Sequence, residues 1–551
     1  MDPLVASPIR RQEISAPPVK NGPVQDAVPY RTHHTPERDL PGGANWVVQK
    51  FGGTSVGKVG VKIAEDIVRA GLKSHRIAVV CSARSSDTKS QGTTNRLLRA
   101  AHHVLEPGRS EFVKMVEALR VDHVKAGQLD VTDADILRGY VEQVNTECMN
   151  LLRILESAQF LKAMTSQTKD MVMSTGERLA CMYMTAVLQS HGVQASLVDV
   201  SEVIDFTAGK DLTEDFYARL TSSLARRIRH LDANVVPVIT GYFGSVPGGL
   251  LQQVGRGYTD LCAALVAVGL GARELQIWKE VDGIFTADPR KVPTARLLDS
   301  VTPSEAAELT FYGSEVIHPF TMDQVIKASI PIRIKNVMNP RINGTVVLPD
   351  PETDSSDTHL SKRPGTFRPR SASHLSAPRR PTAVTIKKDI TIINIHSKKR
   401  TRAHGFLMRV FHLLDSHGLS VDLISSSEVH VSMALHSDLG FHFAAAATPA
   451  PATPSSDANA NVPLYAAIRD LNTMGDVDVV PHMAIISLVG RQLRSMIGIS
   501  GKFFSALGDH GINIEMISQG ASEINISCVI EEGDADRALN VVHTNLFTFL
   551  E

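Results

Sequence analysis

A lysine beside two glycines is the first feature of the chain that could do chemistry. The apolar run 46–48 is typical of the end of a buried strand, and Lys50, Gly52 and Gly53 follow it before a helical pattern begins. A strand, a glycine turn and a helix present backbone N–H groups to an anion. Because these glycines lack a Cβ atom, the backbone could approach a phosphate closely. The alternative is an ordinary strand-to-helix turn, since the run is not the Walker pattern.

Hydroxyl side chains follow a second predicted strand. Ser82 ends the apolar run 77–81, and Thr94 stands at the start of the helical pattern 94–104. Ligands of open α/β sheets bind at the carboxyl ends of the strands, so both hydroxyls are candidates for binding a substrate. The structural alternatives are a strand terminator for Ser82 and a helix N-cap for Thr94.

Two acids and an arginine lie near predicted helix starts. We expect the run 174–179 to open a helix with Glu177 in its first turn, where the carboxylate could bind an ammonium group or simply favour the helix dipole. Arg256, between two glycines, can lay its guanidinium against a carboxylate in a bidentate way. Asp260 could orient the ammonium group or Lys50, or it could cap the helix 261–268.

In this order, the motifs resemble those of aspartate kinases, and the resemblance covers roughly residues 45 to 550. The matching runs are KFGGTSV from residue 50, GER from 176, GRGYTD from 255, VDGIFTADPR from 281 and FYGSEVIHP from 311. The resemblance implies an amino-acid-kinase fold, with three αβα layers around a mainly parallel sheet. The alternation of predicted strands and helices between residues 45 and 350 independently indicates such an α/β domain.

The resemblance also implies roles for individual residues. Lys50 and Asp260 would be catalytic. The amino-acid substrate would be bound by Ser82, Thr94, Glu177 and Arg256, with Arg256 on the α-carboxylate. ATP would be bound by Lys50, Gly52, Gly53, Thr54, Ser55, Lys279, Glu280, Phe285 and Arg290.

The chain departs from the family pattern in three places. Tyr258-Thr259 stands where the family has Gly-Ser, and Lys279-Glu280 stands where many members have Thr-Asp. Glu315 replaces a lysine that approaches the nucleotide in bacterial relatives, so that contact is not carried over. His318 is interpreted as structural or adjacent to the nucleotide.

The implied reaction is ATP + L-aspartate → ADP + 4-phospho-L-aspartate, the first step of threonine and methionine biosynthesis and, in some organisms, of lysine biosynthesis. Mg²⁺ is implied by the nucleotide, and the sequence contains no metal-ligand motif. Two alternatives stay open: another kinase of this fold, acting on glutamate, acetylglutamate or UMP, and an amino-acid sensor whose kinase domain is inactive.

An internal repeat follows. Phe411, Leu414 and Gly418 recur with one offset of 93 residues, and each copy is predicted to be a small α+β module. The repeat resembles a pair of ferredoxin-like ACT domains, which bind amino-acid effectors; two folds that serve only assembly are the alternative. The predicted effector site is the first copy, with threonine as the first choice and lysine as the second, and it comprises Gly405, Phe406, Leu407, Asp422, Ser425 and Ser426.

These patterns divide the chain into five parts. They are a disordered tail (1–44), the catalytic domain (45–351), a linker (352–383), a first ACT domain (384–480) with a flexible insertion (438–462), and a second ACT domain (481–551). ACT pairs in relatives associate, so a homo-oligomer is expected.

Composition narrows the class of protein. The net charge is -1, and no apolar run approaches ~20 residues, so neither nucleic acid nor a membrane is expected as a partner. The 5 cysteines are scattered without a C-x-x-C pair, which favours reduced thiols. Acids in the tail argue against a transit peptide, so we expect a cytoplasmic protein.

Overall fold

The computed structural model describes residues 46–548, except for segments 86–91, 106–110, 205–211, 255–256, 313–318, 349–379, 398–404, 428–429, 437–461, 492, 494–495 and 521–523. The predicted tail, nearly all of the predicted linker and insertion, and three residues of interest, Arg256, Glu315 and His318, lie outside the described residues.

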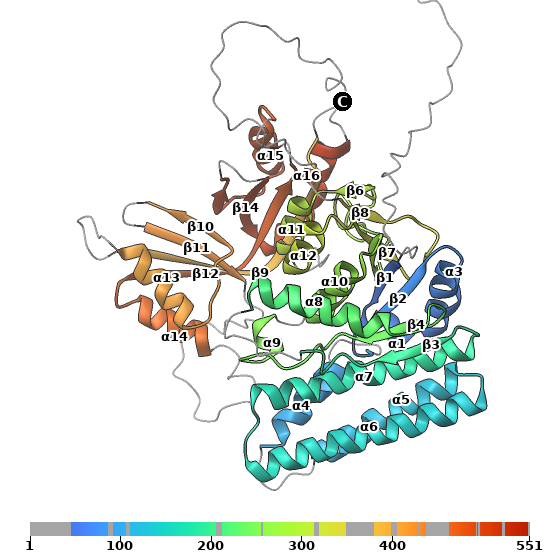
Figure 1. The fold of residues 1–551 in the computed structure, drawn as a ribbon. Helices are drawn as coiled ribbons and strands as arrows, with labels where there is room; N and C mark the ends of the chain where they lie inside the picture. The colour runs from blue at the N-terminus through green and yellow to red at the C-terminus, as the bar shows by residue number, and fades with distance from the viewer. Residues whose placement is uncertain are drawn as a thin grey trace, which may run out of the picture. The chain divides into compact units, whose positions relative to one another are not determined.

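Eight strands form the first sheet in the order β3–β4–β2–β1–β5–β7–β8–β6, and neighbouring strands are parallel except for β7 and β8. β1 lies in the interior of this sheet, with β2 beside it (Figure 1) and β5 paired to its other edge. The strands are β1 (Trp46–Phe51), β2 (Arg76–Cys81), β3 (Ala195–Val198), β4 (Val236–Thr240), β5 (Glu274–Lys279), β6 (Ser300–Val301), β7 (Ile332–Asn336) and β8 (Thr345–Val347).

Helices cover both faces of this sheet because its central strands are apolar on both sides. Trp46 and Val48 of β1 pack with α8, α10 and α12, whereas Val47 and Phe51 pack with α4 to α7. The predicted three-layer α/β fold is therefore confirmed. The helices are α1 (Gly53–Lys58), α2 (Gly60–Lys62), a π-helical turn (Ile63–Val68), α3 (Arg69–Gly71), α4 (Thr93–His103), α5 (Glu111–Asp130), α6 (Ala134–Leu161), α7 (Ser166–Ser190), α8 (Glu214–Arg229), α9 (Leu250–Gln253), α10 (Tyr258–Leu270), α11 (Pro303–Phe311) and α12 (Pro319–Lys327).

One predicted helix boundary was wrong. α7 begins at Ser166, after the N-cap Thr165, whose hydroxyl accepts from the amide of Thr168. Glu177 therefore lies in the middle of α7, buried, and not in a first turn. Its carboxylate cannot be explained by the helix dipole, which acts within the first turn.

Six antiparallel strands form the second sheet in the order β10–β11–β9–β12–β14–β13. The two longest strands, β9 and β12, run through both halves: the first half of β9 pairs with the second half of β12, and the reverse. Both bend where a residue has positive φ, Asp389 (58°) and His482 (59°). The bounds are β9 (Ala383–Ser397), β10 (Leu423–Ser426), β11 (His430–His436), β12 (Gly475–Val489), β13 (Met516–Ser518) and β14 (Asn525–Glu531).

Two α+β modules share this sheet. One end is covered by α13 (Phe406–Ser416) and α14 (Val462–Leu471), and the other by α15 (Ile499–Gly508) and α16 (Ala535–His543), which is flanked by a 3-10 turn (Glu532–Asp534) and a π-helical turn (Thr544–Thr548). The predicted boundary at residue 480 falls inside β12, because this strand runs through both modules. The second module also includes the first half of β9, which precedes the first module in the chain.

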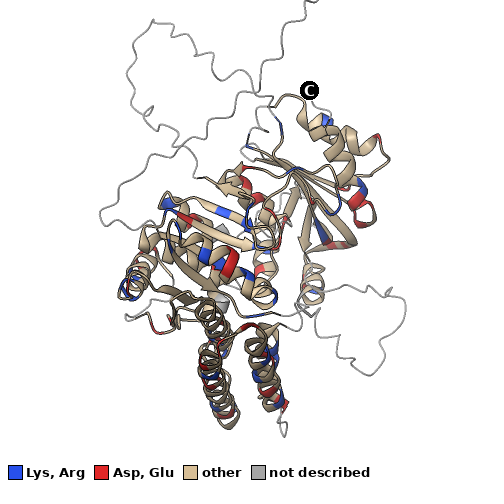
Figure 2. Cartoon of the chain, turned by 90° about the vertical axis from the view of Figure 1, so that its right-hand side faces the viewer, with Lys and Arg blue, Asp and Glu red and all other residues tan. Residues whose placement is uncertain are grey.

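Charged side chains of both signs are interspersed over the described helices and strands (Figure 2). None of the described helices is both long and apolar enough to cross a membrane.

Candidate active site

Lys50 lies near the end of β1 and is held by an acid from α10. Its Nζ atom is 2.7 Å from Asp260 Oδ1, and the two side chains are 12% and 18% exposed. The N-cap of α10 is Gly257, and no side chain caps the helix, so Asp260 orients Lys50 and is not a cap. A fixed cation at the carboxyl end of a central strand suits an anionic ligand.

The two glycines after Lys50 have different roles. A Cβ atom on Gly53 would come within 2.0 Å of the Ala83 carbonyl oxygen, whereas one on Gly52 would meet no atom within 4 Å. Gly53 is therefore required for close packing of the chain that follows β2, and only Gly52 leaves open space for a ligand. The same packing places Ser82 beside the turn, since its amide donates to the Phe51 carbonyl at 3.1 Å.

Glu177 is 1% exposed and only partly satisfied. Its Oε1 accepts from the Thr259 hydroxyl at 2.5 Å, and its Oε2 has no hydrogen-bond partner among the described residues. Burial raises the pKa of Glu177 to about 7, against the opposing effects of the Thr259 hydroxyl, the Tyr242 amide, the Lys50 charge and the Tyr258 hydroxyl. Among the described residues, only the Thr259 hydroxyl lies in hydrogen-bond geometry with this carboxylate. A buried carboxylate oxygen without a partner is costly in a folded protein, so we interpret it as a ligand-binding atom.

The segments that carry Ser82 and Thr94 touch α7 next to Glu177. A Cβ atom on Gly176 would lie 2.9 Å from Thr93 Cγ2 and 3.0 Å from Ala83 Cβ, so α7 touches the segments that carry Ser82 and Thr94. Thr94 is the second residue of α4, whose N-cap is Gly92, so the capping alternative for Thr94 is wrong.

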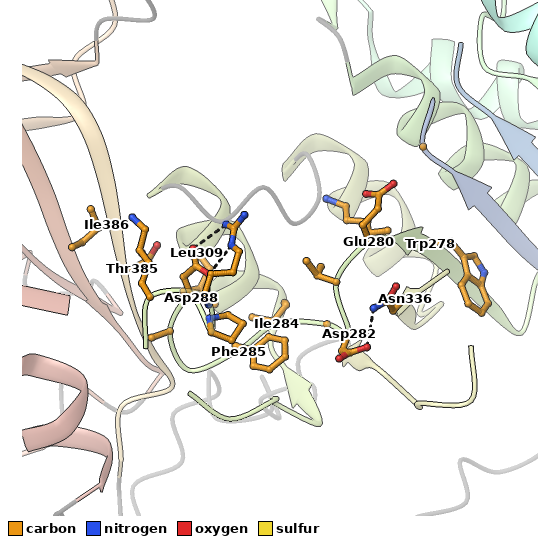
Figure 3. A pocket seen from close by; sticks show the side chains of 18 of the residues that line it. Trp278, Glu280, Asp282, Ile284, Phe285, Asp288, Leu309, Asn336, Thr385 and Ile386 are labelled. Carbon is orange, nitrogen blue, oxygen red and sulfur yellow. Dashed lines mark hydrogen bonds and ion pairs between the residues drawn. The ribbon is translucent and has the colours of Figure 1, made fainter. Parts of the chain in front are cut away.

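A cavity of about 820 Å³ begins at the glycine turn and follows the segment 278–291. Figure 3 shows Trp278, Glu280, Asp282 and Asn336 at one end, and Thr385 and Ile386 of β9 at the other. Two hydrogen bonds fix its polar wall: Ser55 Oγ donates to Glu280 at 2.8 Å, and Asn336 Nδ2 donates to Asp282 at 2.9 Å. The cavity is lined by predicted nucleotide residues, namely Lys50, Gly52, Gly53, Thr54, Lys279, Glu280, Phe285 and Arg290.

Arg290 lines the cavity and is paired with an acid. Its guanidinium donates to both oxygens of Asp288 at 2.9 and 3.0 Å, and its side chain is 86% exposed. The carboxylate of Asp288 already occupies the fork that was expected to reach a phosphate. Binding of a phosphate by Arg290 would require this pair to open.

Asp282, Asn336 and the buried acid Asp170 were not predicted from the sequence. Asp282 and Asn336 are 54 residues apart and meet only because β5 and β7 are neighbours. Asp170 lies in the part of α7 that was not predicted as helix, seven residues before Glu177. That spacing, two turns on one helix face, was the available signal.

The predicted effector residues are partly occupied. The Asp422 side chain is 5% exposed and pairs with Lys387 Nζ at 2.8 Å, so its carboxylate is not open to an ammonium group. Phe406, the first residue of α13, is buried in the core. Gly405, with φ of 77°, is the N-cap of α13, and Leu407 is 42% exposed. Ser425 and Ser426 are exposed on the edge strand β10.

Comparisons with known proteins agree with this geometry. Residues 45–336 match the model of the amino acid kinase family, and residues 486–546 match that of an ACT domain. The aspartokinase of Schizosaccharomyces pombe is 50% identical over 502 residues, covering 91% of this chain and 92% of its own. That of Saccharomyces cerevisiae is 48% identical over 520 residues, covering 92% and 93%.

Solved structures give the same result. Escherichia coli aspartokinase III in complex with aspartate and ADP superposes with a TM-score of 0.65 at 28% identity, covering 91% of this chain and 99% of that one. The same enzyme in complex with lysine and aspartate gives 0.66 at 27% identity, covering 92% and 100%. The chain therefore belongs to the amino acid kinase family and, within it, to the aspartokinases that carry C-terminal ACT domains.

Proposed function

We propose that the protein transfers the γ-phosphoryl group of ATP to the side-chain carboxylate of L-aspartate, giving ADP and 4-phospho-L-aspartate. The observation that carries this proposal is the unpartnered Oε2 of Glu177, buried within the electrostatic reach of Lys50. Lys50 also lines the cavity that would hold the nucleotide. A site for an ammonium group thus adjoins a site for phosphates. Aspartokinase III with bound aspartate and ADP supports both assignments.

The chemistry requires positioning more than proton transfer. An aspartate carboxylate is ionised at neutral pH because its pKa is about 4, so no general base is needed. One of its oxygens attacks the γ-phosphorus. The bond from that phosphorus to the β,γ-bridging oxygen breaks, and this oxygen leaves as part of ADP with the bonding electrons. We assign Lys50 and the amides of the glycine turn to stabilise the charge on the transferred group, and Asp260 to hold Lys50 in place. Arg256 is proposed to bind the α-carboxylate.

The residues of the cavity also fit a nucleotide-borne Mg²⁺. This ion keeps waters and phosphate oxygens as ligands and needs only one or two carboxylates. Glu280 and Asp282 line the cavity and would hold it, whereas no group of three or more potential ligands occurs among the described residues. When bound, the ion would neutralise phosphate charge.

The remaining proposals extend the same function. We assign the enzyme to the cytoplasm and to the first step of threonine and methionine biosynthesis, with threonine as the inhibitor and lysine as the second choice. The exposed serines of β10 support a hydroxyl-bearing effector. A homo-oligomer is proposed from the behaviour of ACT pairs.

The experiment is ADP release by the purified full chain with ATP and Mg²⁺, with aspartate, glutamate or UMP offered separately. We expect release that depends on aspartate alone. Release with glutamate or UMP instead would assign the chain to another substrate of this fold, and no release with any acceptor would indicate an amino-acid sensor.

A further inference from the structure

A segment that follows β4 lies against the side chain that donates to Glu177. A Cβ atom on Gly241, the first residue of this segment, would come within 2.5 Å of the Thr259 side chain. Thr259 is itself the residue that donates to Glu177. The position of this segment therefore determines how the acid is presented to a ligand.

The other end of the segment is fixed by a buried acid. The Leu250 amide donates to Asp170 Oδ2, and Asp170 is only 4% exposed. Gly248 and Gly249 precede this contact with φ of 82° and 92°, values that favour glycine. A Cβ atom on Gly249 would lie 3.1 Å from the same Asp170 oxygen. The turn is therefore shaped around the carboxylate of Asp170.

Both acids lie on one face of α7, since seven residues make about two helical turns. Between the two contacts, Tyr242, Phe243 and Val246 of the segment are buried in the core that also contains α8, α10 and α12. A close-packed segment fixed at one end is also fixed at the other, because interiors transmit small displacements.

We propose that Asp170 is a positioning residue for the amino-acid substrate: it anchors the Gly249–Leu250 turn and so holds Gly241 against Thr259, the residue that donates to Glu177. The inference rests on the proposed function, in which Glu177 binds the ammonium group of aspartate. Asp170 itself touches no reacting atom. It acts through the segment 241–250, which also leads to Arg256 six residues later.

The kinetic test compares Asp170→Ala with Asp170→Asn, which keeps an oxygen acceptor for the Leu250 amide. We expect Asp170→Ala to raise the KM for aspartate about 10- to 100-fold, the scale of a misplaced binding group, with the KM for ATP within about twofold of wild type. Asp170→Asn should recover most of the affinity. The matched control is Asp130→Ala, which removes an acid that also contacts α7, through the Tyr183 hydroxyl. A wild-type KM for aspartate in Asp170→Ala, equal rises in both KM values, or no rescue by Asp170→Asn would overturn the proposal.

A second measurement is independent of the substrate. Amide hydrogen exchange of the peptide 241–254 should be faster in Asp170→Ala than in wild type, Asp170→Asn or Asp130→Ala. Unchanged exchange in Asp170→Ala would contradict the anchoring role whatever the substrate. Faster exchange, in a protein whose wild type releases no ADP with aspartate, would support the anchor and count against the proposed function instead.

Discussion

Lys50 and Glu177 differ in how their charges are compensated: Lys50 has an ion-pair partner, whereas one oxygen of Glu177 has no hydrogen-bond partner among the described residues. Lys50 is paired with Asp260 and lines an open cavity, whereas Glu177 is buried with one oxygen unpartnered. Leaving a carboxylate in this state reduces the stability of the fold, and strongly shifted pKa values are concentrated at functional sites. The two residues therefore give predictions of different kinds, one about turnover and one about pH.

Replacement of Lys50 should reduce turnover. We expect Lys50→Ala to lower kcat at least ~100-fold, the scale of losing one preorganised charge, and to weaken ATP binding less. Lys62→Ala, which removes a surface ion pair to Asp66 on the following helix, is the control and should behave as wild type. Near-normal kcat in a folded Lys50→Ala variant would remove Lys50 from the mechanism.

The raised pKa of Glu177 predicts that aspartate binds better at higher pH. With a pKa of about 7 in the free protein, Glu177 is mostly protonated at pH 6 and mostly ionised at pH 8. Only the ionised form attracts an ammonium group, so the KM for aspartate should be roughly tenfold higher at pH 6 than at its plateau above pH 8.

The matched measurement uses Glu177→Gln, which cannot ionise. Its KM for aspartate should be high at every pH and should lack the transition near pH 7. A transition of the same size in Glu177→Gln would assign the titration to another group.

Among the elements, the second sheet and α16 hold the segment 278–291, which lines the cavity proposed to bind the nucleotide. The Thr286 carbonyl accepts from the Val384 amide at 2.8 Å, and the Thr286 hydroxyl meets His543 Nε2 at 2.9 Å. Asn540 Nδ2 donates to the Lys291 carbonyl at 3.0 Å. The segment that carries Phe285 and Arg290 is therefore fixed by the part of the chain that bears the ACT modules.

α11 makes a second connection, through Glu305. This buried carboxylate accepts from Thr382 Oγ1 at 2.6 Å, from the Arg491 amide at 2.9 Å and from Thr302 in a capping box. Burial alone would raise its pKa, but these hydrogen bonds lower it below the ordinary value of 4.5.

Removal of this carboxylate should destabilise the protein. We expect Glu305→Ala to lower the free energy of unfolding by about 1–3 kcal/mol or more, because buried donors lose their acceptor. A lowered pKa stabilises the fold above the unfolded value and loses this effect as the pH falls, so the deficit should shrink below about pH 4.5. Denaturant titration at pH 7 and pH 4 measures it, with the exposed neighbour Ser304→Ala as control. An equal deficit at both pH values would contradict the account.

The elements show what the sequence can predict. The apolar run 77–81 predicted β2 to within one residue, because a buried parallel strand leaves a continuous apolar signal. The start of α7 was missed because residues 166–170 are polar and give no clear helix signal. They are helical because of the N-cap and tertiary packing. The pairs Lys387–Asp422 and Ser55–Glu280 join residues far apart in the chain, and no local pattern predicts them.

At the scale of the molecule, the ion pair Lys387–Asp422 lies between the edge strand β10 and the catalytic fold. Lys387 Nζ is also 4.9 Å from the centre of the Phe311 ring, at the end of α11. An effector that displaces β10 would therefore disturb a group in contact with α11. Inhibition requires that the effector bind the inactive state more tightly.

The proposed threonine site is tested by Ser426→Leu. We expect this variant to need at least about tenfold more threonine for half-inhibition, because the added side chain fills space beside β10 and removes a hydroxyl. The measured quantity is the activity ratio with and without threonine for each protein. Ser416→Leu, at the end of α13, is the control. An unchanged inhibition curve would place the effector elsewhere, and no inhibition of wild type by threonine or lysine would remove the regulatory proposal.

The central claim is that the phosphoryl group moves to the carboxylate of aspartate. An acyl phosphate reacts with hydroxylamine to give a hydroxamate, so trapping the product of the wild-type enzyme tests this transfer directly. With ATP, Mg²⁺, aspartate and hydroxylamine, we predict one aspartyl hydroxamate per ADP released, and both products at least ~100-fold more slowly with Lys50→Ala. ADP without hydroxamate would show that water, and not aspartate, accepts the phosphoryl group and would contradict the account.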